Sequence, residues 1–415
     1  MTIDEIASQI TLSRRADNIF NEALLPDETR RIRREARDFA ETVLKPEAFR
    51  LNTTPESRDS FPRAMFKAMA AAGLYEIPFP TDVGGRGLEF PTLATMIVLE
   101  ELGYFSAGIA SALFDAQALL VGQTLANASD TLRLRYLPKI VRGEVVGSFA
   151  TSEPQASTDL SPGALRTMAT RTENGWRING KKRWISNAIA ADFILTLCRT
   201  GSNEQTIILV ETDQNGVEVG APDLKMGNHP QLTSDVTYNE ALAPEENVVG
   251  KVGGGLKAAL SALMLGRIGI GAVGVGLAQA AFDQASAHME QRHAFGQPLA
   301  RFQHWQFTFA DHAIQLEAAR GIYLKAAQLH DIGFPADAEA AMAKVAGSRL
   351  AVDVARDAIQ VCGAYGFARY VQGAESERTL EAIYRDAKIG EIYEGANEIQ
   401  KWILARRIFG RHITG

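Results

Sequence analysis

The order in which hydrophobic periods follow one another is the sequence feature that most constrains this chain. Apolar residues recur at helical spacing over about the first third, and again from about residue 255 nearly to the end. Between about residues 147 and 250 the pattern changes to short apolar or alternating runs separated by turn signals. Because the strands are segregated from the helices, we expect an α+β fold rather than an alternating parallel sheet.

Three domains follow from this order. We expect an N-terminal all-α domain at residues 1–145, a middle β domain at 146–250 and a C-terminal helical domain at 251–415. A first helix should begin at Asp27 and end at Pro46, and a buried helix should cover residues 106–126. The strands expected most clearly are residues 176–185, 193–198 and 207–210. Helical spacing in the last third is carried by Ala310, Ala313, Ile314, Ala318 and Ile322.

Composition excludes several classes of function. A net charge of -6 over 415 residues provides no broad cationic surface, so nucleic acid is not an expected partner. Cys198 and Cys362 are far apart, and the seven histidines form no HExxH motif, so neither a disulfide scaffold nor a metal site is expected. The longest uncharged apolar stretch, residues 268–282, is too short to span a membrane. The N-terminus resembles neither a signal nor a transit peptide, so we expect a cytoplasmic protein.

Gly269, Gly271 and Gly274 spell G-x-G-x-x-G, the pattern of a dinucleotide-binding turn. Such a turn must follow a strand, whereas the preceding residues are rich in alanine and leucine and read as helix. We therefore predict a buried helix whose small residues let a neighbouring backbone approach closely.

Four segments carry a more specific signal. They are FATSEPQASTD at residues 149–159, NGKKRWISN at 179–187, QRHAFGQPLARFQ at 291–303 and RDAKIGEIYEGANEIQ at 385–400. In this order and spacing they resemble the acyl-CoA dehydrogenase family, and the resemblance runs over about residues 25–410. It implies that the middle domain is an antiparallel, barrel-like β domain and that the C-terminal domain is a four-helix bundle.

The resemblance also implies an FAD site. Its predicted contacts come from the loop after the first strand, from the Trp-Ile-Ser segment, from an Arg-x-x-Phe-Gly segment that reaches across a subunit interface, and from two later edges. These residues are Phe149, Ser152, Thr158, Trp184, Ser186, Arg292, Phe295, Gln303, Gln360, Gly363, Ala396 and Glu398. Gln155 and Ser157 stand where the family has glycines, and residues near 372–381 look inserted.

In the same resemblance, Glu394 of the Tyr-Glu-Gly segment is the catalytic base that removes a proton from the carbon α to a thioester carbonyl. A carboxylate in an apolar pocket gains basicity by desolvation, which suits that role. Arg267, Tyr393 and Phe114 are the expected substrate contacts. The resemblance further implies an acyl-CoA substrate, an electron-transferring flavoprotein as the next carrier, and a homotetramer.

Two alternatives remain open at this point. One is a flavoenzyme of the same fold that uses oxygen, or that acts on a carrier-protein thioester or a non-thioester substrate. The other is a helical binding protein without catalysis. Because Phe114, Asp115 and Gln117 lie on a helix that the resemblance places at the acyl pocket, a short or polar-tailed substrate is a further hypothesis.

Overall fold

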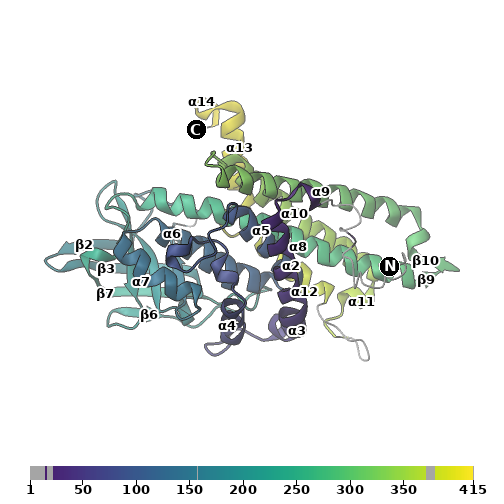
Figure 1. Ribbon diagram of the computed structural model, residues 1–415, viewed down its shortest axis with the longest axis horizontal. Coiled ribbons are helices and arrows are strands. Elements are labelled where there is room, and N and C mark those ends of the chain that lie inside the picture. Colours follow the sequence, from purple (N-terminus) through teal and green to yellow (C-terminus); the bar gives the residue numbers. More distant parts are fainter. Residues whose placement is uncertain (1–14, 16–21, 157, 371–378, 415) are drawn as a thin grey trace.

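A computed structural model describes residues 15, 22–156, 158–370 and 379–414 (Figure 1). The N-terminal part is helical. Its longer elements are α2 (Asp27–Phe39), η3 (Ala40–Leu44), α3 (Lys45–Thr53), α4 (Arg63–Ala71), α5 (Pro91–Phe105), η6 (Ile109–Gly122), α6 (Gln123–Ala126) and α7 (Asp130–Val141). Short 3-10 turns lie at Glu22–Leu24, Leu74–Glu76 and Thr81–Val83.

The first helix begins at Asp27 as expected, but Pro46 does not end it. A π-helical turn, η3, joins α2 to α3, and Pro46 lies in the first turn of α3. Proline is tolerated there because the first turn of a helix needs no donor from its backbone nitrogen. The predicted buried helix at 106–126 is confirmed as η6 and α6, and η6 is wound as a π-helix.

Eight strands form the middle sheet: β1 (Gly147–Ala150), β2 (Met168–Thr172), β3 (Gly175–Ser186), β4 (Phe193–Arg199), β5 (Gln205–Glu211), β6 (Val217–Val219), β7 (Thr233–Ala243) and β8 (Val248–Val249). The order is β6-β7-β3-β2-β4-β5-β8, and β1 also pairs with β4. The three strands expected most clearly are confirmed as β3, β4 and β5. The sheet is mixed rather than antiparallel throughout, because β1 and β2 both run parallel to β4.

Successive side chains of a strand point to opposite faces, and nearly every residue of β4 and β5 is buried. Both faces of these two strands are therefore covered. One face, which includes Leu195 and Leu209, packs against η6, α6 and α7. The other face, which includes Ile194 and Ile208, shares a core with β3 and β7. The sheet therefore curls so that its own strands enclose an apolar interior, as expected for a barrel-like domain.

The C-terminal part consists of α8 (Gly255–Gln291), a β9 (His293–Ala294) and β10 (Gln297–Pro298) hairpin, α9 (Gln303–Asp331), α10 (Asp337–Cys362), α11 (Ala364–Phe367), α12 (Leu380–Ile389), α13 (Asn397–Phe409) and α14 (Arg411–Thr414). The three long helices α8, α9 and α10 run side by side, with the sheet at one end of the molecule and the β9–β10 hairpin at the other (Figure 1). One apolar core joins these helices to those of the N-terminal part.

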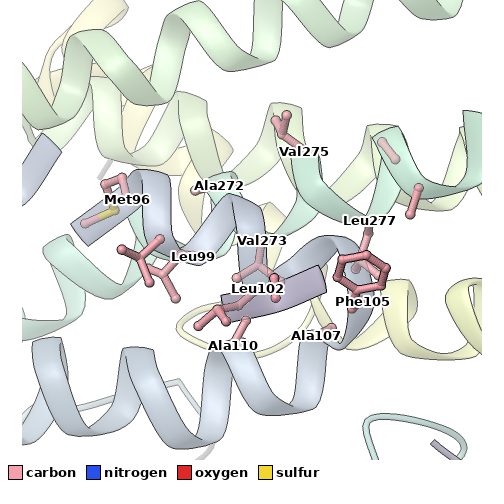
Figure 2. Close-up of a cluster of buried hydrophobic side chains, with 14 of the residues drawn as sticks. Met96, Leu99, Leu102, Phe105, Ala107, Ala110, Ala272, Val273, Val275 and Leu277 are labelled. Atoms are coloured by element: carbon pink, nitrogen blue, oxygen red, sulfur yellow. The ribbon is translucent and has the colours of Figure 1, made fainter. Parts of the chain in front are cut away.

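The glycines of α8 allow close packing on two sides, which confirms the sequence prediction. A methyl group at Gly271 or Gly274 would overlap the backbone of α10, and one at Gly276 would overlap the carbonyl oxygen of Glu100 on α5. Beside these glycines, Leu99 and Leu102 of α5 meet Val273 of α8 in the buried cluster of Figure 2. The G-x-G-x-x-G pattern therefore serves helix packing.

Gly276→Ala is expected to destabilise the protein by about 1–3 kcal/mol, because the added methyl forces α5 away from α8. Gly321→Ala on α9 is a matched control. Apart from the backbone of its own helix and its chain neighbours, no atom of this chain lies within 4 Å of the Cβ position there, so the substitution should stabilise by about 0.5–1 kcal/mol. Denaturant unfolding of the two variants measures both effects. Equal stabilities would contradict the close-packing role of Gly276.

Two helical stretches, Ile109–Ala126 and Gly255–Gln291, are long and apolar enough to cross a membrane by length and composition alone. The second extends well beyond the apolar stretch recognised in the sequence. In their apolar windows, 83% and 72% of the residues are buried inside the fold. Both are therefore core helices whose apolar surface is covered by protein.

The helical spacing expected in the last third is confirmed as α9, but the positions that revealed it lie mostly on its outer side. Ala310 and Ala318 are exposed, and Ile314 is 68% exposed. The buried side instead carries residues such as Leu316 and Tyr323. Within this chain α9 thus presents an apolar stripe to the outside.

Candidate active site

A cavity of about 1560 Å³ lies where the β domain meets α8, α12 and α13. Small-molecule sites usually occupy about 300–1,000 Å³, so this cavity has room for a cofactor and a substrate together. Eight of the predicted site residues line it: Phe149, Ser152, Thr158, Trp184, Ser186, Arg267, Tyr393 and Glu394.

Glu394 lies in the segment between α12 and α13, and hydrogen bonds to the backbone carbonyl groups of this segment hold it in place. Its carbonyl oxygen accepts a hydrogen bond from Arg267 Nε at 3.2 Å, and Gln400 Nε2 donates to the carbonyl oxygen of Gly395 at 2.9 Å. No acceptor for the backbone N–H of Glu394 is found within the described part of the chain. That N–H remains available to a ligand in the cavity.

Backbone strain is concentrated at predicted site residues. Six non-glycine residues in the described chain have positive φ, and three of them are Trp184 (62°), Phe295 (51°) and Glu394 (54°). Such conformations are unfavourable for residues with a Cβ and persist only where the surrounding structure imposes them. Their occurrence at these three positions is typical of functional sites.

The carboxyl group of Glu394 is protonated more readily than an exposed glutamic acid. Burial raises its pKa to about 7, and the opposing effects of a hydrogen bond with Asp115 and of the charges of Arg267 and Lys344 are smaller. A methyl group at Gly266 of α8 would overlap Glu394 Oε2, so the glycine makes room for the carboxyl group. A pKa near neutrality suits a general base.

A buried ion pair anchors the loop that follows β1. Lys182 Nζ lies 2.9 Å from Glu153 Oε1 and donates to the carbonyl oxygen of Thr151 at 3.0 Å. Glu153 also accepts hydrogen bonds from the backbone N–H groups of Arg166 and Thr167. Burial raises the pKa of Glu153, but Lys182 and the donated N–H bonds outweigh it and leave the pKa lowered. The buried ion pair and these hydrogen bonds therefore fix the position of the loop that carries Ser152.

The cavity wall formed by β3 and β7 suits a planar, polar ligand. Trp184, near the end of β3, is 57% exposed. Ser186 Oγ accepts a hydrogen bond from Gln231 Nε2 at 2.9 Å, which fixes its position. Thr233 Oγ1 is buried at the cavity wall and has no partner among the described residues. The exposed indole, the hydroxyls and this unpaired oxygen fit an aromatic cofactor with polar edges.

The cavity is also rich in positive charge. Seven basic side chains and four acidic ones line it, and most of the basic ones lie on α12 to α14. The basic residues are Lys225, Arg267, Arg385, Lys388, Arg406, Arg407 and Arg411. This balance suits a ligand that carries phosphate groups.

Five predicted cofactor contacts lie elsewhere. Arg292, Phe295 and Gln303 lie at the β9–β10 hairpin and the start of α9, and Gln360 and Gly363 lie at the end of α10. All five are exposed, Phe295 to 96%, and they gather at the end of the molecule opposite the sheet (Figure 1). Within one chain they do not reach the cavity.

Three further residues that were predicted to contact substrate or cofactor do not line the cavity. Phe114 is fully buried in the core and stacks against Tyr75, which corrects its predicted role as a substrate contact. The helix η6 instead turns Ser111 and Asp115 toward the cavity. Ala396 immediately precedes α13 and Glu398 is exposed in its first turn, and neither lines the cavity. Residue 157 and most of the apparent insertion, residues 371–378, lie outside the described residues.

Sequence reasoning missed two parts of the site, the Lys182–Glu153 pair and Gln231, and did not predict that Asp115 lies beside Glu394. The Lys182–Glu153 pair gave no signal, because charged residues are common in strands and loops. Gln231 lies outside all the motifs recognised in the sequence. Asp115, however, stood out in the sequence as a lone acid within the apolar helix of residues 109–122. A buried charge in an apolar run is the kind of signal that points to function.

Comparisons with known proteins agree with this geometry. The chain matches the models for the acyl-CoA dehydrogenase N-terminal domain at residues 26–144, the middle domain at 148–241 and the C-terminal domain at 253–409. It is 34% identical over 396 residues to the mitochondrial short-chain specific acyl-CoA dehydrogenase of Rattus norvegicus, covering 94% of this chain and 92% of that one. It is 33% identical to the 3-(aryl)acrylate reductase of Clostridium sporogenes, covering 91% and 97%.

The butyryl-CoA dehydrogenase of Megasphaera elsdenii has a similar structure, with a TM-score of 0.86 at 31% identity over 94% of this chain and 99% of that one. The chain therefore belongs to the acyl-CoA dehydrogenase family of flavin-dependent oxidoreductases. Its cofactor is FAD, and the cavity wall described above fits that group.

Proposed function

We propose that the protein is an FAD-dependent acyl-CoA dehydrogenase that desaturates a short acyl thioester between its α and β carbons, with Glu394 as the base. The observation that carries the proposal is the carboxyl group of Glu394, which lines a large cavity and has a pKa raised to about 7 by burial. An acid of this kind exists partly as carboxylate near neutral pH and can accept a proton there.

Different residues of the chain would transfer the proton, bind the thioester carbonyl and hold the cofactor. Glu394 takes the proton from the α carbon, and its unpaired backbone N–H donates to the thioester carbonyl, where negative charge develops. Arg267 fixes the backbone of Glu394. FAD, when bound, supplies the acceptor for the hydride that leaves the β carbon. Trp184, Ser186 and Thr233 would hold its ring system, and Ser152 and Thr158 its more polar part.

The substrate class rests on the relatives and on the cavity. The rat relative is named for short-chain substrates and the Megasphaera elsdenii enzyme for butyryl-CoA. In this chain the buried acid Asp115 on η6 lies beside Glu394 and would meet the acyl group near its reacting carbons. A carboxyl group there disfavours a long apolar chain, so a short or polar-tailed acyl group fits better.

The test is anaerobic reduction of the bound flavin by a panel of saturated acyl-CoA thioesters. The loss of flavin absorbance measures the reduction. The panel includes butyryl-, hexanoyl- and palmitoyl-CoA, a branched thioester and one with a terminal carboxyl group. Rapid bleaching by short thioesters and slow bleaching by palmitoyl-CoA is the expected result. A protein that binds FAD but is reduced by no acyl-CoA would refute the proposal.

The Clostridium sporogenes relative favours one alternative, reduction or oxidation of an aryl-substituted acid rather than a thioester. The free acid 3-phenylpropionate and its CoA thioester therefore belong in the same panel. Faster bleaching by the free acid would support this alternative.

We also propose a homotetramer in which a second copy completes the cofactor site, with an electron-transferring flavoprotein as the next acceptor. Two exposed features support the assembly: the apolar stripe of α9, and the group formed by Arg292, Phe295 and Gln303 at the far end. An exposed aromatic ring beside an arginine is typical of an interface. Sedimentation of the holoprotein should give the mass of four chains.

A further inference from the structure

Asp115 is a second carboxyl group at the reacting end of the cavity. It lies on η6, an apolar helix, and is 1% exposed. Its carboxyl group lies beside that of Glu394, because Asp115 Oδ1 and Glu394 Oε2 fill the spaces left by Gly269 and Gly266 on neighbouring turns of α8, although the two acids are far apart in the sequence. A hydrogen bond between two carboxyl groups requires a proton on one of them, because two carboxylates only accept.

The surrounding structure is shaped around both carboxyl groups. Gly266 and Gly269 lie one turn apart on α8, and a methyl group at either would overlap Glu394 Oε2 or Asp115 Oδ1, respectively. Neither of these two buried oxygens has a hydrogen-bond donor among the residues that the structure describes. Asp115 forms no ion pair with a basic side chain in the described part of the chain, so its charge is not neutralised directly. The two acids thus depend on each other.

Other charged groups face the pair from several elements. Arg267 on α8 binds the backbone of Glu394, and Lys344 on α10 donates to Asn397 Oδ1 at 2.8 Å. Burial lowers the pKa of Lys344 to about 8, with Glu394 opposing that shift. Tyr393 lies beside both acids, and the charges of Asp337 and Asp386 act on Arg267 and Tyr393, respectively. This setting can balance one negative charge on the pair more readily than two.

We propose that Asp115 and Glu394 form a carboxyl pair that holds one proton in the resting enzyme, in which Asp115 is the positioning acid and donates its proton in a hydrogen bond to the Glu394 carboxylate. The catalytic part of the proposal rests on the proposed role of Glu394 as base. When Glu394 accepts the proton from the α carbon, the pair holds two protons and no charge. That proton passes to water after the product leaves, which restores the single negative charge.

The contribution of the carboxyl pair to the free energy of unfolding decreases as the pH rises. Burial and the neighbouring acid raise the pKa of Asp115 well above its ordinary range, as burial does for Glu394. Because both pKa values are higher in the folded protein, the folded state binds protons more tightly than the unfolded chain. The pair therefore favours folding at low pH and loses that contribution as the pH rises through the folded values.

Thermal unfolding of the holoprotein between pH 5 and 9 tests the pair without any substrate. Asp115→Asn keeps the shape and a hydrogen-bond donor but cannot ionise. Relative to the wild type it should become more stable as the pH rises, with the ratio of the two unfolding constants changing by up to about tenfold per pH unit. Asp337→Asn, which removes another carboxylate from the cavity wall, should leave the pH dependence unchanged. A stability difference between Asp115→Asn and wild type that is constant from pH 5 to 9 would overturn the pair.

The pH profile of flavin reduction tests the catalytic part. Asp115→Asn should keep the apparent pKa of wild-type reduction, because its amide still donates to Glu394. Asp115→Ala removes the donor and should raise that apparent pKa by about 1–2 units. Identical profiles for Asp115→Ala and the wild type would overturn the positioning role. If no acyl-CoA reduces even the wild type, the proposed function fails, whereas the stability measurement still decides whether the pair exists.

Discussion

Glu394→Gln is expected to lower the rate of flavin reduction by an acyl-CoA substrate by about 10²- to 10⁴-fold, the usual contribution of a positioned general base. Glutamine keeps the shape of the side chain and can still bond with Asp115, but its amide cannot accept the α proton. The backbone contacts from Arg267 and Gln400 do not involve the carboxyl group and should persist. Anaerobic stopped-flow spectroscopy measures the rate directly.

Glu391→Gln is the matched control. Glu391 lies three residues earlier in the same segment and pairs with Lys388 at its surface. Its removal takes one carboxylate from the segment without touching Glu394, so reduction should continue at close to the wild-type rate. Undiminished reduction in Glu394→Gln would place the base on another residue and refute the assignment.

The large divisions of the fold could be predicted from the sequence because periodicity reports local burial. Helical spacing from Asp27, alternation in the strands and the small residues of α8 each depend on neighbours a few positions away. The details that failed depend on contacts that the local pattern does not contain. The helix continues past Pro46 because a π-helical turn precedes it, and β1 and β2 pair parallel to β4, which the pattern within one strand does not reveal.

The candidate site was predictable where a short motif carries the chemistry, as at Glu394 and Trp184. It was not predictable where distant segments meet. Phe114 and Asp115 are neighbours in the sequence, yet a difference of one residue around η6 turns the first into the core and the second toward Glu394. Only the packing of η6 against α8 decides which of them reaches the cavity.

The remaining predicted contacts illustrate a different limit. Motif resemblance grouped Arg292 and Gln360 with Trp184 in one cofactor site, whereas in a single chain they lie at opposite ends of the molecule. A motif does not report which copy of the chain would supply a residue, and under the proposed tetramer a second copy would bring Arg292 and Gln360 to the cofactor. In the proposed tetramer the exposed face of α9 would have the same explanation, because apolar spacing does not distinguish a core from an interface between copies.

Lys182→Met is expected to reduce the free energy of unfolding by about 3–5 kcal/mol, because it leaves Glu153 buried without its ionic partner. Methionine nearly matches the lysine stem in shape, so little of this loss should come from packing. The loop that contains Thr151 and Ser152 loses its anchor at the same time, and the purified variant should therefore also retain less FAD. Denaturant unfolding and the ratio of flavin to protein absorbance measure the two effects.

Lys181→Met provides the control on the same strand. Lys181 points to the other face and pairs with Asp235 at 2.7 Å, and its side chain is half exposed. Exposed pairs contribute about 0–1 kcal/mol, so this variant should unfold almost as the wild type does. The double variant Lys182→Met/Glu153→Gln should recover part of the loss, because it removes the unpaired charge and keeps an acceptor for the backbone N–H groups of Arg166 and Thr167. Equal stabilities for Lys182→Met and Lys181→Met would mean that the buried pair does not anchor the loop.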